Sequence, residues 1–201
     1  MISNHSDEQL MQHYCEGDLL AFKELYQRHS GGVYRFIAWR SPRREWVDEI
    51  VQDSWAALHE ARQRYVPSAS FRTYLYQIAR NRLIDLLRQK EAVLASEIDG
   101  LLHGENGESR FERLADSAAQ AASAQDELEK KQEIDALHQA IRSLPGEQKE
   151  ALVLQQFNAM SIEEIAEITM VTPETVKSRL RYAMQKLRAR LTAPMQAGER
   201  A

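Results

Sequence analysis

The sequence has one cysteine, Cys15, and no long run of apolar residues. A single cysteine excludes an internal disulfide and cannot start a zinc site of the usual ligand spacing, so we expect neither a metal nor a cofactor. The absence of about 18 consecutive apolar residues excludes an ordinary transmembrane helix. The N-terminal residues also lack the basic-then-apolar pattern of a signal peptide, which predicts a cytoplasmic protein.

The motifs of the common enzyme classes are missing as well. The six histidines form no HxxxH or HExxH pair. The sequence has no nucleophile elbow, no P-loop and no dinucleotide fingerprint. We therefore predict that the chain is not an enzyme and has no small-molecule substrate.

Charge is distributed unevenly, although the net charge of the whole chain is only −4. Residues 1–90 hold 13 Lys and Arg against 11 Asp and Glu, residues 91–133 hold 4 against 11, and residues 134–201 hold 9 against 8. The acidic middle is rich in Gly, Ser and Ala, and so long a connection is unusual inside one domain. We expect a first domain at residues 1–92, a linker at 93–132, a second domain at 133–192 and a tail at 193–201.

Apolar residues recur at helical spacing on both sides of this linker, and no segment keeps the two-residue period of a strand. The sequence therefore predicts an all-α fold of two small helical domains joined by an acidic flexible linker. The expected helices that matter for function span residues 43–65, 71–90, 162–168 and 173–191.

The last two of these helices have the layout of a helix-turn-helix. Ser161 and Glu164 form a capping box before the first, and Thr172 followed by a proline starts the second. Residues 173–191 hold six Lys and Arg against one acid, so this helix can neutralise phosphates and present cations to base edges. The alternative is a solvated basic face on an ordinary helical hairpin.

The second of these helices also has a regular apolar stripe, which we expect to pack inward. The stripe consists of Val176, Leu180, Ala183 and Leu187. The residues outside it, together with the cap, are the candidates for DNA contact: Thr172, Glu174, Thr175, Lys177, Ser178 and Arg181.

A second basic helix is expected at residues 71–90, with five Lys and Arg against one acid. Its apolar arc leaves Gln77, Arg80, Asn81 and Arg88 on the opposite side. Aromatic residues are interleaved with this charge and could stack on unpaired bases. The alternative is a solvated face over core aromatics, and a core role is favoured for Phe71 and Tyr74.

Between these basic helices, residues 45–60 contain five acids and no Lys or Arg. Such a helix repels DNA, so a basic protein surface is its natural partner. An acidic face exposed only to solvent is the alternative.

Taken in order, these segments resemble the sigma factors of bacterial RNA polymerase. The strings DEIVQDSW (48–55) and FRTYLYQIARNRLID (71–85) are similar to regions 2.2 and 2.3–2.4 of that family, and the strings LP (144–145), SIEEIA (161–166) and TVKSRL (175–180) to region 4. Neither a region 1 nor a region 3 domain is present, as in the extracytoplasmic-function (ECF) branch.

The resemblance implies a sigma2 helical bundle that binds core polymerase and the −10 element, and a sigma4 helix-turn-helix that binds the −35 element. Its implied partners are the beta-prime clamp helices, the beta flap, promoter DNA and an anti-sigma factor, which, if membrane-bound, could hold the chain at the inner membrane face. The implied polymerase contacts are Asp48, Glu49, Gln52 and Asp53, and the implied −10 contacts are Ser68, Arg72, Gln77, Arg80, Asn81 and Arg88.

Three positions depart from the family pattern. Trp46 replaces an acidic residue, Met170 and Val171 replace a glycine turn, and Gln77-Ile78 replaces the tryptophan pair with which primary sigma factors open DNA. The last change implies weaker intrinsic melting. A helix-turn-helix regulator or a helical interaction module that never joins polymerase remains the alternative function, and co-purification with core polymerase separates these.

Overall fold

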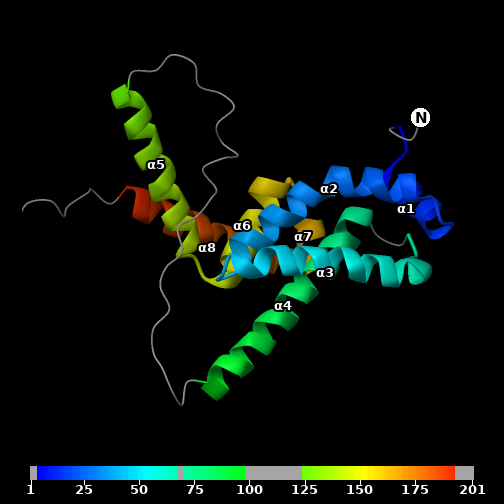
Figure 1. Ribbon diagram of the computed structural model, residues 1–201. Helices are drawn as coiled ribbons and strands as arrows, with labels where there is room; N and C mark the ends of the chain where they lie inside the picture. The colour runs from blue at the N-terminus through cyan, green and yellow to red at the C-terminus, as the bar shows by residue number, and fades with distance from the viewer. Residues whose placement is uncertain (1–3, 68–69, 98–123, 193–201) are drawn as a thin grey trace, which may run out of the picture.

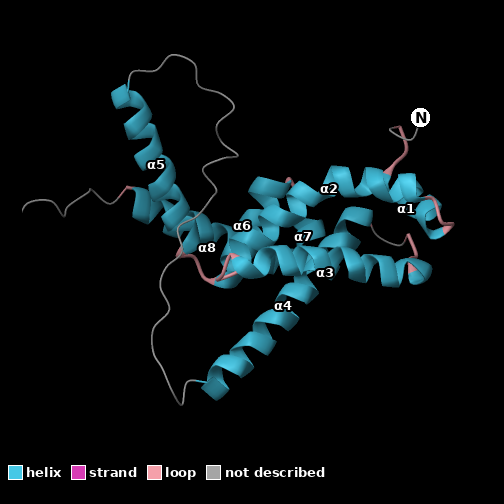
Figure 2. Ribbon diagram, in the orientation of Figure 1, coloured by secondary structure: helices cyan, strands magenta, loops and turns pink. Residues whose placement is uncertain are grey.

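The computed structural model describes residues 4–67, 70–97 and 124–192. Within these ranges the chain is helical and has no strand, which confirms the all-α prediction (Figure 2). None of the helices in the described ranges is long and apolar enough to span a membrane. The elements are α1 (Asp7–Cys15), α2 (Leu19–Arg40), α3 (Glu45–Ala61), the 3-10 turn η1 (Arg62–Arg64), α4 (Phe71–Glu97), α5 (Ala124–Arg142), α6 (Gly146–Asn158), α7 (Ile162–Thr169) and α8 (Pro173–Leu191).

Three helices of the first domain, α1, α2 and α4, start where a side chain accepts a first-turn backbone N–H group, whereas α3 has no side-chain cap. Ser6 and Gln9 form a capping box at α1, and Asp18 accepts from the backbone of Leu20 at α2. The start of α4 is capped from another helix, because the Glu8 carboxylate accepts the Phe71 N–H at 2.9 Å. This bond ties α1 to the helix that carries the expected −10 face.

The second domain consists of α5 to α8, and both of its predicted start signals are confirmed. The Ser161 hydroxyl accepts the Glu164 N–H at 3.1 Å, and the Thr172 hydroxyl accepts the Thr175 N–H at 3.3 Å. The predicted stripe of α8 is also confirmed, since all four of its residues are buried. Helix α8 packs against α6 and α7 and also contacts α5. Lys177 and Arg181, outside the stripe, are exposed.

The turn between α7 and α8 has no glycine, and the backbone shows the consequence. Met170 caps α7 in the left-handed region, at φ 56° and ψ 45°. This backbone conformation is unfavourable for any residue that has a Cβ atom. Its side chain is 71% exposed, so no packing of the side chain offsets this strain. The departure from the family pattern at this turn is therefore accommodated by backbone strain.

The two domains pack against each other, which the sequence did not predict. Figure 1 shows α6 and α7 behind the long α2 and the start of α4, and the contacts join α2 to α6 and α4 to α7. Helix α4 continues to Glu97, past the expected end near residue 90, and α5 begins at Ala124, inside the range expected for the linker. Residues 98–123 and the tail at 193–201 lie outside the described residues.

Candidate protein and nucleic-acid interfaces

The acidic face of α3 is open to solvent. Val47, Ile50 and Leu58 are buried and fix the rotation of the helix against the bundle. With that rotation, all four predicted polymerase contacts lie on the outward side and are exposed: Asp48, Glu49, Gln52 and Asp53. Four neighbouring carboxylate or amide groups with no basic residue among them form a surface that complements a cationic protein partner.

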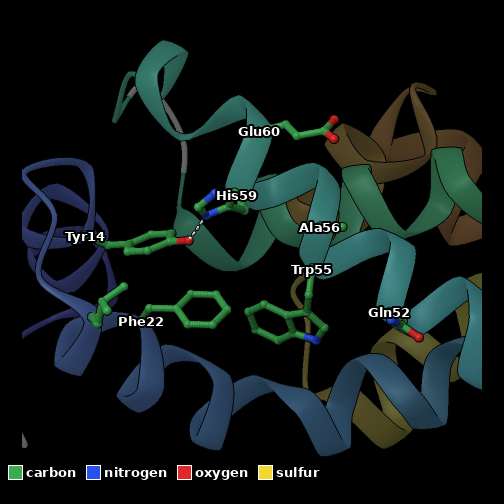
Figure 3. Close-up of a pocket in the computed structure, with 8 residues that line it drawn as sticks. Tyr14, Phe22, Gln52, Trp55, Ala56, His59 and Glu60 are labelled. Atoms are coloured by element: carbon green, nitrogen blue, oxygen red, sulfur yellow. Dashed lines mark hydrogen bonds between the residues drawn. The ribbon is translucent and has the colours of Figure 1, made fainter.

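An aromatic groove of about 470 Å³ lies beside this acidic face (Figure 3). Its walls include Tyr14 from α1, Phe22 from α2 and Trp55 from α3, and the Trp55 ring meets Phe22 edge-on at 5.8 Å. Leu19 at the groove is 71% exposed. Gln52 belongs to both surfaces, so the acidic face and the groove are continuous. Sequence reasoning missed the groove, because its residues come from three helices.

The predicted −10 face of α4 is divided into an open part and a covered part. Asn81 and Arg88 are exposed, whereas Arg72, Gln77 and Arg80 are half-buried against the second domain. The sixth predicted residue, Ser68, lies outside the described residues. The helical spacing that separated the polar side of α4 from its apolar arc is supported, since Leu75, Ala79, Leu83 and Leu86 are buried and Ile78 is half-buried.

The side chains in the covered part of this face donate hydrogen bonds to carboxylate and backbone carbonyl oxygens of the second domain. Arg72 Nη2 lies 2.9 Å from both carboxylate oxygens of Glu164 on α7. Arg80 Nε donates to Glu150 Oε1 on α6 at 3.1 Å. Gln77 Nε2 donates to a backbone carbonyl of α7 at 3.1 Å. Two of the three arginines expected to contact the −10 element therefore meet carboxylates of the second domain.

Besides its ion pair with Arg72, Glu164 completes the capping box of α7, where its carboxylate accepts the Ser161 N–H at 2.9 Å. Burial raises the pKa of Glu164, but the hydrogen bonds from Ser161 and Arg72 outweigh burial and hold the pKa below its ordinary value. The carboxylate is therefore ionised at neutral pH and attracts the Arg72 guanidinium as a full charge.

The aromatic residues of α4 point mainly into the protein. Phe71 is fully buried and Tyr74 is half-buried, as favoured from the sequence. Tyr76 is also buried, and its hydroxyl donates to Asn158 Oδ1 of α6 at 2.8 Å. Burial raises the pKa of Tyr76 well above its ordinary value, so the phenol stays protonated. Base stacking by Tyr76 is excluded in this arrangement.

Helix α8 presents its predicted contacts without obstruction from the described residues. Thr172, Glu174, Lys177 and Arg181 are exposed. Thr175 and Ser178 are half-buried, and the Thr175 hydroxyl is 3.1 Å from that of the cap.

One of the basic residues of α8 has an internal role that the sequence did not indicate. Arg179 Nη2 pairs with Glu147 on α6 at 2.8 Å, and its side chain is only 16% exposed. This ion pair joins α8 to α6 within the second domain.

Comparison with known proteins covers most of the chain. The family model described as Sigma-70 region 2 matches residues 25–93, and Sigma-70, region 4 matches residues 134–187. The chain is 31% identical over 176 residues to the ECF RNA polymerase sigma factor RpoE of Cereibacter sphaeroides, covering 87% of this chain and 88% of the relative. It is 28% identical over 193 residues to the ECF RNA polymerase sigma factor SigM of Mycobacterium tuberculosis, covering 96% and 88%.

Two solved structures share the fold. CnrH in complex with the cytosolic domain of CnrY superposes with a TM-score of 0.65 at 23% identity, covering 94% of this chain and 99% of that one. The sigma factor RpoE in complex with the anti-sigma factor NepR from Bartonella quintana also gives 0.65, at 18% identity, with coverage of 86% and 98%. Together with the matches to regions 2 and 4, these findings show that the chain belongs to the ECF branch of the sigma-70 family of RNA polymerase sigma factors, which are transcription initiation factors.

Proposed function

We propose that this sigma factor holds core RNA polymerase through the acidic face of α3 and reads the two promoter elements with α4 and α8. The observation that carries the proposal is that one chain presents one acidic and two basic helical faces. DNA is a polyanion, so the acidic face is unsuited to it and suited to a basic protein surface. The acidic face would thus contact polymerase, and the two basic faces would contact the promoter DNA.

The polymerase contact is assigned to Asp48, Glu49, Gln52 and Asp53, which would meet the clamp helices of the beta-prime subunit. Carboxylates at the rim of such an interface mainly guide encounter and fix register, whereas apolar contacts supply the affinity. The aromatic groove beside Gln52 offers that apolar contact. The second domain would dock on the beta flap, so polymerase would hold both ends of the chain.

The −10 element is assigned to the polar side of α4, with Arg72, Arg80 and Arg88 on the backbone and Gln77 and Asn81 on the bases. Ser68, before α4, is assigned to the same element. Arginine binds phosphate oxygens with paired N–H groups, and amide side chains can donate to and accept from base edges. The departure at Gln77-Ile78 leaves no tryptophan pair to stabilise the melted strand, so opening would depend on a well-matched promoter.

The −35 element is assigned to the N-terminal half of α8. A recognition helix enters the major groove with its first residues, and Thr172, Glu174, Thr175, Lys177, Ser178 and Arg181 occupy that end. Lys186, Arg188 and Arg190 lie farther along the helix and would meet phosphates. Direct contact with bases is expected from Lys177 and Arg181, which share one face.

The division of labour extends to the domains and partners. Residues 1–92 would act as the sigma2 domain and residues 133–192 as the sigma4 domain, with the linker at 93–132 between them. We also propose that an anti-sigma factor holds the chain until it is needed, which is supported by the two related folds having been solved as complexes with CnrY and NepR. The chain would act where polymerase and DNA are, in the cytoplasm.

The test is a double charge reversal, Asp48→Lys with Asp53→Lys. Because both side chains are exposed, we expect the free energy of unfolding to change by only about 0.5 kcal/mol for each substitution. Binding to core polymerase is expected to be lost, because the introduced lysines repel the basic partner surface. Pull-down with core polymerase and run-off transcription measure the two effects. Glu16→Lys makes the same kind of change at the exposed end of the first helix and serves as the control. Polymerase affinity equal to wild type in the double variant would refute the assignment of this face.

A further inference from the structure

Helix α1 contacts two neighbouring helices through adjacent acidic residues of its first turn. The Glu8 carboxylate accepts the Phe71 N–H at the start of α4, 63 residues away in the sequence. The next carboxylate, that of Asp7, contacts α2, where its two oxygens lie 3.0 Å from Arg28 Nη1 and 2.7 Å from His29 Nε2. The acceptor for α4 therefore belongs to a turn that is itself fixed against α2.

The bond from Glu8 completes the capping of the first turn of α4. The Ser70 hydroxyl accepts the Thr73 N–H at 3.1 Å, and Glu8 accepts the N–H of Phe71 at 2.9 Å. First-turn N–H groups have no partner inside their own helix, and a negative charge beside them is favourable. This hydrogen bond is also the main influence that holds the pKa of Glu8 below its ordinary value, so the carboxylate is ionised at neutral pH. The fully buried Phe71 ring lies 5.4 Å from the His29 ring between centroids, so α1 and α2 together fix the start of α4.

The other end of α1 contacts η1, the element that precedes α4 in the chain. The Cys15 thiol donates to the Arg62 carbonyl oxygen at 3.0 Å. Gln63 Nε2 donates to the Cys15 carbonyl oxygen at 3.2 Å. Glu8 and Cys15 are seven residues apart, which is about 10 Å along a helix axis. Because a helix keeps its length, α1 sets the distance between η1 and the first turn of α4.

We propose that Glu8 is a positioning residue for promoter recognition, and that α1 is the spacer that sets where the first turn of α4 meets the −10 element. This inference rests on the assignment of α4 to that element. The first turn carries Arg72, which directly follows the capped N–H of Phe71. Without its acceptor this turn loses its bond to α1, and Arg72 would reach the promoter in several orientations instead of one. The effect is specific to the −10 element, because the residues assigned to polymerase and to the −35 element lie on α3 and α8.

Promoter selectivity of the holoenzyme tests the proposal, measured by run-off transcription from promoters with varied −10 bases and from promoters with varied −35 bases. Glu8→Ala removes the acceptor and should reduce discrimination among −10 sequences by about tenfold, the effect of one mismatched base pair. Its −35 profile and its binding to core polymerase should equal those of wild type. Glu8→Gln keeps an oxygen that can accept the Phe71 N–H, so it should restore most of the discrimination.

Asp18→Ala is the matched control, because it removes the carboxylate that accepts the Leu20 N–H at the start of α2 and leaves the start of α4 intact. Both alanine variants lose one helix cap in the same domain, so a general loss of stability would affect both alike. The proposal is overturned if Glu8→Ala keeps the wild-type −10 profile, if glutamine at this position fails to restore it, or if Asp18→Ala relaxes it as much.

If Glu8→Ala does not fold, Gln63→Ala takes its place. Gln63 is exposed, so the substitution leaves the core intact, but it removes a hydrogen bond between η1 and α1. We then expect a smaller relaxation of the −10 profile, and an unchanged profile overturns the proposal.

Asn81→Ala separates this inference from the function on which it rests. Asn81 is exposed on α4 and is assigned to the −10 bases. An unchanged −10 profile in this variant would refute the assignment of α4 itself. If Asn81→Ala relaxes the profile and Glu8→Ala does not, only the positioning role of α1 is refuted.

Discussion

Helices α4 and α8 both carry a basic face, but the face of α4 is partly covered by the second domain and that of α8 is open. Each carries several arginines opposite an apolar stripe, and each is assigned to one promoter element. The outward end of α8 is open, whereas carboxylates of α6 and α7 cover Arg72 and Arg80 of α4. A basic face is therefore available to DNA only where no acidic partner in the same chain reaches it.

The largest expected effect separates base contact from phosphate contact on the open helix. Arg181→Ala should cost about 1–3 kcal/mol at the proper −35 sequence and relax its discrimination, because a base contact is lost. Arg188→Ala should weaken binding to all sequences alike and reduce the salt slope by about one. Transcription from promoters with varied −35 bases measures both. An unchanged preference profile in Arg181→Ala would mean that this residue clamps phosphate and that the docking of α8 is rotated.

An intermediate effect distinguishes the covered and open parts of α4. Arg88→Ala should weaken binding of the free chain to −10 single strands by about 1 kcal/mol, because an exposed phosphate contact is lost. Arg80→Ala should weaken it less or strengthen it, since the loss of a contact is offset by release of Glu150. In the polymerase complex both variants should be impaired. Fluorescence anisotropy with the free chain and with holoenzyme gives the comparison, and equal losses in the two free variants would contradict it.

The smallest expected effect concerns the turn that aims α8. Met170→Gly should raise the free energy of unfolding by about 0.5–1 kcal/mol, because glycine adopts the left-handed backbone of this position without a Cβ penalty. Chemical denaturation of the full chain measures the change. Met170→Ala keeps the Cβ atom and should not raise the free energy of unfolding. If the alanine variant is stabilised as well, the effect comes from loss of the methionine side chain and not from the backbone.

The features that the sequence predicted correctly are local ones, namely apolar residues that recur at helical spacing and capping residues at helix starts. The buried stripe of α8 and the two capped helix starts follow from spacing over a few residues, and the structure agrees at each of them. The covering of α4 could not be predicted in this way. Arg80 and its partner Glu150 are 70 residues apart, and Arg72 and Glu164 are 92 apart. Helical periodicity identifies the polar side of a helix but not which other part of the chain lies against it.

The position of Trp39 gives the protein a built-in optical probe. Its indole is 6% exposed and lies in the contact between the domains, against the Phe157 ring. Separation of the domains would bring this indole into water and shift its emission to longer wavelength. Trp55 borders the groove beside the acidic face of α3, so its emission would respond to a protein partner instead. With Trp46 replaced by phenylalanine, these two natural fluorophores would follow opening and partner capture in an unlabelled chain.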